Sequence, residues 1–168
     1  MQFLPKWFVK PFAKPYVAGI ETNEVLSVVK KLNDEGFSAT IDILGEFVKT
    51  REEAVEVRDK YAELIKLINE KKLDSTVSVK LTHMGLDLDF DYCKNLLLGL
   101  AEKAKEFNVG IAIDMENSPY TDSIYEIYGA SLKTYHKISA VMQAYLFRSL
   151  KDLKAINSSK LILSLIHI

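Results

Sequence analysis

The sequence has little of what several classes of protein depend on. Its only cysteine, Cys93, excludes an internal disulfide and a metal site built from several cysteine ligands. The 22 Lys and Arg residues nearly balance the 23 Asp and Glu residues, so we expect no nucleic-acid partner. No apolar run approaches the roughly 20 residues that cross a bilayer. The 3 histidines lack metal-ligand spacing and there is no glycine-rich phosphate loop, so we expect no metal site, and a nucleotide cofactor would need other binding groups.

Four short runs of β-type residues recur along the chain, with helical stretches between them. Alternation of strand and helix predicts an α/β protein with a parallel sheet. Apolar residues toward outer helices and polar residues toward a lumen predict a (β/α)8 TIM barrel. At 168 residues the chain is shorter than the roughly 200 of a complete barrel, so we expect an incomplete one with about four β/α units. The runs are Ala39–Leu44, Val77–Thr82, Ile111–Glu116 and Ala140–Tyr145.

Successive strand residues point to opposite faces, which sorts the side chains of these runs into two sets. The apolar set is predicted to face the helices: Ile41, Ile43, Val77, Val79, Leu81, Ile111, Ile113 and Met115. The polar set is predicted to face the lumen: Thr40, Asp42, Ser78, Lys80, Thr82, Asp114, Glu116, Gln143 and Tyr145.

Helix signals fill the stretches between the runs. Thr22 can cap a helix that continues to Gly36. Thr50 and Glu53 form a capping box for a longer helix that ends near Lys71. Further helices are predicted to begin at Asp89, Thr121 and Ser149.

The first 19 residues differ in composition from the rest of the chain. Pro5, Pro11 and Pro15 alternate with lysines and aromatic residues, which argues against a long regular helix. One interpretation is a peripheral contact with the inner face of a membrane, because aromatic and lysine side chains suit that interface. The interpretation that we favour is an arm that packs its aromatic residues on the barrel. The single cysteine favours a reducing compartment, and we expect a cytoplasmic protein.

The chain divides into an N-terminal arm and helix over residues 1–38 and the first half of a barrel over residues 39–162. The helix that begins at Ser149 should lead to a fifth strand, but the chain continues into the run Leu163–Ile168. That run resembles the translated end of a sequencing adapter, so we expect residues 163–168 not to be native. The alternative is a genuine apolar strand.

Lys80, Asp114 and Gln143 fall at the carboxyl ends of predicted strands, where barrels carry their chemistry. A lysine on the lumen side of an apolar strand is costly to bury unless it is paired. Lys80 could bind a substrate carboxylate, form a Schiff base or bridge to Asp114. The amide of Gln143 suits a planar heteroaromatic ligand. Glu46 follows a glycine in the first loop after a strand, where a charged residue can move.

Several motifs together resemble those of bacterial proline dehydrogenases. The resemblance covers about residues 3–160 and keeps the motifs in the same order. The motifs are Lys10–Gly19, Ala39–Glu46, Ser78–Asp89, Ile113–Thr121 and Val141–Arg148.

This resemblance implies a flavin-containing β/α barrel, with FAD as cofactor, that oxidises L-proline to 1-pyrroline-5-carboxylate and passes electrons to a membrane quinone. It implies that Lys80 lies beside the substrate carboxylate and that Asp114 is the catalytic aspartate. Met115 would contact the flavin through its backbone, and Gln143 would hydrogen-bond the isoalloxazine. Glu46 would gate the site by pairing with an arginine of the family's last helix.

The later half of the family's barrel is absent from these residues. That half supplies an arginine on strand five, a Lys-Gly-Ala-Tyr motif, further flavin contacts and a helix with paired arginines. We therefore expect the 168 residues alone to be inactive and to lack flavin. Two alternatives stay open: a Schiff-base aldolase that uses Lys80, and a half-barrel fragment without catalysis.

Overall fold

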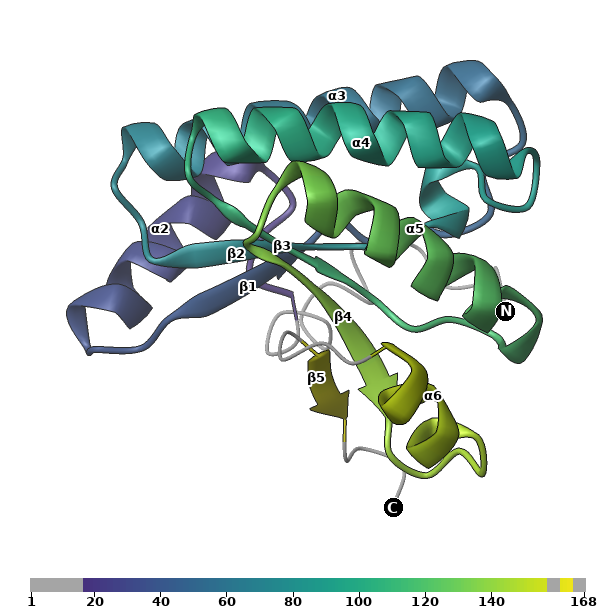
Figure 1. Ribbon diagram of the computed structural model, residues 1–168. Helices are drawn as coiled ribbons and strands as arrows, with labels where there is room; N and C mark the ends of the chain where they lie inside the picture. Colours follow the sequence, from purple (N-terminus) through teal and green to yellow (C-terminus); the bar gives the residue numbers. More distant parts are fainter. Residues whose placement is uncertain (1–16, 157–160, 165–168) are drawn as a thin grey trace, which may run out of the picture.

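The computed structural model describes residues 17–156 and 161–164, which form one parallel sheet with helices between its strands (Figure 1). The strands lie side by side in sequence order, and every neighbouring pair is parallel. This order is the winding of a β/α barrel, because each right-handed crossover places its helix on the same face. The predicted α/β class and incomplete barrel are confirmed. The strands are β1 (Ala39–Asp42), β2 (Ser75–Val79), β3 (Gly110–Ile113), β4 (Ile138–Gln143) and β5 (Leu161–Ser164).

Three long helices pack along one side of the sheet, as Figure 1 shows. They are α3 (Arg51–Glu70), α4 (Phe90–Glu106) and α5 (Thr121–Thr134), which follow β1, β2 and β3 in turn. α2 (Thr22–Asp34) precedes β1, and α6 (Ser149–Ile156) follows β4. Each of the three long helices contacts the next, so the helical layer is continuous from α3 to α5.

The hydrophobic core lies between this helical layer and the sheet. The apolar strand residues predicted to face the helices, including Ile41, Val77 and Ile111, are buried, except for Ile43, which is half-buried. Each such side chain contributes about 1.5–3 kcal/mol when it leaves water. The helices bury large side chains against them that have no exposed surface: Tyr61, Ile65, Leu97, Leu100, Ile124, Ile127 and Tyr128.

Two of the long helices begin at the predicted caps. The Thr50 hydroxyl accepts a hydrogen bond from the Glu53 N–H at 3.2 Å at the start of α3. The Asp89 carboxylate accepts one from the Tyr92 N–H at 3.0 Å at the start of α4. The Glu53 side chain bonds the N–H of Lys49 at 2.7 Å, one residue before the position that the capping box predicts. Side-chain oxygens thus satisfy amide groups that a helix start leaves open.

Some local expectations were wrong. The first helix is capped at Glu21, not at Thr22, because Glu21 pairs reciprocally with Glu24. The strands also end earlier than their runs predict. After β2 the chain turns at Leu81, where φ is −71° and ψ is −28°, into the 3-10 helix η1 (Thr82–Met84). Alternation of faces stops at that turn, so Thr82 is fully buried and does not face the lumen.

A fifth strand extends the sheet beyond the four that the runs predict. β5 pairs with β4 from Ala140 opposite Leu161 to Gln143 opposite Ser164. The apolar run offers backbone groups to the edge of β4, which would otherwise stay unpaired. Residues 163 and 164, expected to be adapter-derived, therefore occupy strand positions. Residues 165–168 lie outside the described residues, and the origin of residues 163–168 stays a prediction.

The proline-rich part of the expected arm falls in residues 1–16, outside the described residues. The arm's helical part is present as α2 (Figure 1). Among the residues that the structure describes, no helix is both long enough and apolar enough to span a bilayer.

Candidate active site

Three charged side chains meet at the carboxyl ends of the first three strands. Asp42 is the last residue of β1, Lys80 follows β2 and Asp114 follows β3, and the parallel register brings them to one edge. Lys80 Nζ lies 3.0 Å from Asp42 Oδ2 and 3.2 Å from Asp114 Oδ2. The bridge from Lys80 to Asp114, one of the predicted alternatives, is present, and Asp42 completes it from the other side. We call these three residues the charged triad.

The lysine of the charged triad is held in its protonated form. Its side chain is only 17% exposed, and burial alone lowers the pKa of an amine. The hydrogen bond and charge of Asp42, with those of Asp114, outweigh burial and raise the pKa of Lys80. An ammonium has three N–H donors, and the two carboxylates engage two of them among the described residues. One donor is left for an anionic ligand.

Asp114 is oriented through both of its carboxylate oxygens. Oδ2 faces Lys80, and Oδ1 accepts a hydrogen bond from the N–H of Met115 at 2.9 Å. The backbone N–H of Asp114 donates to the carbonyl oxygen of Val79 at 2.9 Å, which extends the pairing of β3 with β2. A ligand that uses the Met115 N–H must therefore share it with Asp114.

A pocket of about 470 Å³ lies next to the charged triad, over the carboxyl ends of β3 and β4. It brings together Glu46, Met115 and Gln143 of the predicted site residues, whereas Lys80 and Asp114 are not among its lining residues. The backbone at Gln143 is fixed, because its carbonyl oxygen accepts a hydrogen bond from the Ser149 hydroxyl at 2.5 Å. The remaining lining residues are Phe47, Glu116, Asn117, Ser118, Tyr145 and Leu146.

Glu46 reaches this pocket on a loop that passes close to His83. A Cβ atom on Gly45 would lie 2.3 Å from Cε1 and Nε2 of the His83 ring, so a larger residue there would force the ring or the loop to move. Burial lowers the pKa of His83, and its Nδ1 is buried with no hydrogen-bond partner among the described residues. The sequence led us to consider His83 only as a metal ligand. No sequence pattern indicates that its ring lies against Gly45. The pairing of Glu46 with an arginine of the last helix stays a prediction.

Glu116 was predicted to share the polar face of Asp114, but its carboxylate bonds the backbone and side chain of Thr82. Its carboxylate accepts a hydrogen bond from the Thr82 N–H at 3.1 Å and a second from the Thr82 hydroxyl. Burial raises the pKa of Glu116, and the bonds from Thr82 oppose that rise. Glu116 thereby connects η1 to the segment that follows β3.

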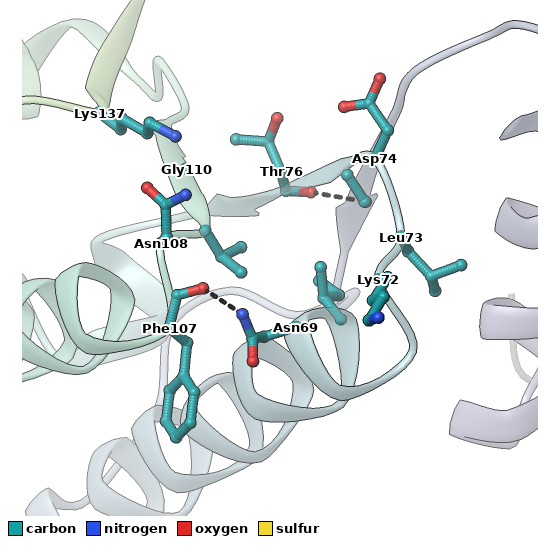
Figure 2. A pocket seen from close by; sticks show the side chains of 12 residues that line it. Asn69, Lys72, Leu73, Asp74, Thr76, Phe107, Asn108, Gly110 and Lys137 are labelled. Atoms are coloured by element: carbon teal, nitrogen blue, oxygen red, sulfur yellow. Dashed lines mark hydrogen bonds between the residues drawn. The ribbon is translucent and has the colours of Figure 1, made fainter.

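A second pocket, of about 390 Å³, opens at the amino ends of β2 and β3 (Figure 2). Figure 2 shows Lys72 and Asp74 on one side of it and Asn108 and Lys137 on the other. The Asn69 side chain donates a hydrogen bond to the backbone carbonyl of Phe107 at 2.8 Å and so joins the end of α3 to the end of α4. In β/α barrels this end of the strands serves stability.

Comparisons with known proteins relate the chain to one family. The family model described as proline dehydrogenase matches residues 25–159. Proline dehydrogenase 1 of Bacillus subtilis subsp. natto is 36% identical over 148 residues, which are 88% of this chain and 49% of that protein. Proline dehydrogenase 2 of Bacillus subtilis strain 168 is 32% identical over 152 residues, 90% of this chain and 50% of that protein. The chain thus spans about half the length of the curated relatives it matches.

A solved structure supports the same relationship. Proline utilization A from Bdellovibrio bacteriovorus, inactivated by N-propargylglycine, superposes with a TM-score of 0.81 at 25% identity. The match covers 90% of this chain and 19% of that one.

Proposed function

The chain belongs to the proline dehydrogenase family, and from this premise we propose that it forms the first half of a barrel that oxidises L-proline to 1-pyrroline-5-carboxylate. FAD is the proposed cofactor and a quinone the proposed electron acceptor. The observation that carries this proposal is the charged triad next to a pocket at the carboxyl ends of the strands. We propose a cytoplasmic protein that contacts the inner face of the membrane, where a quinone is within reach.

The charged triad suits an amino acid that carries both charges. The remaining N–H of Lys80 can donate to the carboxylate of proline, as a charge-assisted hydrogen bond. Asp42 and Asp114 make the net charge of the triad negative, which favours the cationic amine of the same molecule. Lys80 is therefore the proposed substrate-binding residue. Asp114, oriented by Lys80 and by the Met115 N–H, is the proposed catalytic residue.

The residues that line the pocket fit one part of a flavin. Its volume of about 470 Å³ lies within the range of ligand sites, roughly 300–1,000 Å³. The amide of Gln143 offers a donor and an acceptor to the polar edge of an isoalloxazine, and Phe47 and Tyr145 offer aromatic surface. Met115 and Gln143 are thus the proposed FAD contacts, and Glu46 is the proposed gate. When bound, FAD supplies the two-electron acceptor that proline oxidation requires.

No observation favours the Schiff-base aldolase. A lysine that attacks a carbonyl must lose its proton, and such lysines have a lowered pKa. The pKa of Lys80 is raised by its two carboxylates. Borohydride trapping with a carbonyl substrate should therefore leave Lys80 unmodified, and a stable adduct at Lys80 would favour the aldolase.

The proposed function is tested by completing the barrel. The chain would be produced alone and together with the C-terminal half of Bacillus subtilis proline dehydrogenase 1. We expect a colourless protein from the 168 residues alone, because a partial contact surface has to offset about 4–15 kcal/mol of lost ligand freedom. We expect flavin absorbance and proline-dependent dye reduction from the completed barrel. A folded, flavin-loaded complex that does not reduce the dye with proline would overturn the proposal and favour a half barrel without catalysis.

A further inference from the structure

We propose that Tyr61 and Asp42 form a positioning pair that holds Lys80 in place for its ligand. This inference rests on the proposed function only for the identity of that ligand, L-proline. The pair links the helical layer to the charged triad: Tyr61 belongs to α3, and Asp42 ends β1. Neither residue was predicted to act at the site: the sequence placed Asp42 only on the lumen face and assigned no role to the Tyr61 hydroxyl.

The tyrosine hydroxyl is built into the end of β1. Tyr61 has no exposed surface, yet its hydroxyl accepts a hydrogen bond from the Ile43 N–H at 3.2 Å, one residue beyond the strand. The same hydroxyl lies 3.4 Å from Asp42 Oδ1 and 3.5 Å from the carbonyl oxygen of Ile43. The charged oxygen is the better acceptor for its single proton. Burial raises the pKa of Tyr61, so it stays a neutral donor.

The two oxygens of Asp42 have separate partners. Oδ1 faces the Tyr61 hydroxyl on the core side, and Oδ2 faces Lys80 Nζ at 3.0 Å on the polar side. Because Tyr61 is fixed by the packing of α3, its contact with the Asp42 carboxylate helps to hold that carboxylate, and thereby the flexible Lys80 side chain, in place. A lysine with a four-carbon stem needs such anchors, because its rotamer freedom is otherwise large.

The surroundings of Lys80 make the contribution of Asp42 measurable. Asp42 faces it from the end of β1, Asp114 faces it from just after β3, and His83 of η1 is close enough for the charge of Lys80 to act on it. The neutral Tyr61 hydroxyl of α3 faces Asp42. Among the groups that raise the pKa of Lys80, Asp42 has the largest effect. Removal of its charge should lower that pKa and leave Asp114 as the remaining anchor.

The first measurement uses the 168-residue chain and needs no substrate. The Nζ titration of Lys80 would be followed by NMR in chains with ¹³C-labelled lysine, with Lys80→Met to assign the signal. We expect Asp42→Asn to move the titration of Lys80 to lower pH. Asp87→Asn removes the same charge from an exposed site and should leave the titration unchanged. A titration in Asp42→Asn that superposes on wild type would overturn the inference, whatever the enzyme does.

The second measurement places the same variants in the completed barrel. We expect Asp42→Asn to bind proline about tenfold more weakly, the scale of one charge-assisted hydrogen bond, and to lose affinity at a lower pH than wild type. Tyr61→Phe should show a smaller loss, whereas Tyr135→Phe should show none, because the buried Tyr135 hydroxyl has no partner among the described residues. If the wild-type barrel does not bind proline, the proposed function fails, and the NMR titration still decides the positioning role.

Discussion

The two ends of the sheet use polar side chains in different ways. At the amino end they bond the backbone: Asn33 binds both the N–H and the carbonyl of Asp74, at 2.8 and 3.0 Å, and Asn69 binds the carbonyl of Phe107. At the carboxyl end Lys80 bonds the side chains of two aspartates and keeps one N–H without a partner among the described residues. At the amino end, polar groups therefore close turns, whereas at the carboxyl end a polar group is left for a ligand.

The same contrast distinguishes the two pockets. The one in Figure 2 is lined by turns whose amides already hold the chain together. The other is lined by residues at the carboxyl ends of β1, β3 and β4, and it adjoins the half-buried Lys80, which two carboxylates hold. A volume alone does not separate them, since both are of similar size. Substitutions at the two ends should therefore change different properties.

The largest effect on stability is expected from Gly45→Ala at the carboxyl end. The new Cβ would meet the His83 ring at 2.3 Å, and either the ring or the loop must move. Such overpacking costs about 1–3 kcal/mol. Urea unfolding of the chain would measure it, with Gly99→Ala as the control. Gly99 has open space around it on α4, and alanine there should stabilise the helix by about 0.5–1 kcal/mol. Equal unfolding free energies for wild type and Gly45→Ala would show that the loop does not depend on this contact.

Asn33→Ala, at the amino end, is expected to lower stability without changing the titration of Lys80 in the charged triad. The variant loses the two bonds to Asp74 and a third to the carbonyl of Phe37, at 2.8 Å. We expect a loss of about 1–2 kcal/mol in the free energy of unfolding, because each bond contributes about 0.5–1.5 kcal/mol net. The exposed Asn23→Ala serves as the control. A shift in the Lys80 titration of Asn33→Ala would contradict the separation of the two ends.

The smallest effect is expected from Glu116→Gln, which should change how the free energy of unfolding depends on pH. Burial raises the pKa of Glu116 above its ordinary value of 4.5, so the folded state binds this proton more tightly than the unfolded state. That stabilisation is complete at pH values below the ordinary pKa, and it is lost as the pH rises through the raised pKa of the folded state. Glutamine carries no such proton, so the unfolding free energy of the variant should fall less over this interval, by less than about 1 kcal/mol. Parallel pH profiles for the two proteins would argue against a buried, protonatable Glu116.

Much of the fold was predictable, because alternation and capping are local. The buried faces of β1 to β3 and the caps at Thr50 and Asp89 follow from neighbouring residues alone. The burial of Thr82 was not predictable, because it depends on a backbone turn at Leu81 that the alternating pattern does not register. The fifth strand was predicted only as the less favoured alternative, because its pairing depends on the open edge of β4.

The candidate site was predictable where it rests on strand ends. Lys80 and Asp114 were identified by position and residue type, and their ion pair is present. The partnership of Tyr61 with Asp42 was not, because a tyrosine in an apolar stripe gives no sign of where its hydroxyl points. That direction is set by how α3 packs on β1, which is a tertiary property.

The most direct test of the central claim is the affinity of the completed barrel for proline after Lys80→Met. We expect a loss of about tenfold to a hundredfold, since a hydrogen bond to a charged group is worth about 1.5–3 kcal/mol, with flavin absorbance unchanged. Lys60→Met, which removes an exposed cation from α3, should bind proline as wild type does. Unchanged proline affinity in Lys80→Met would contradict the claim that the carboxyl-end triad is the substrate site.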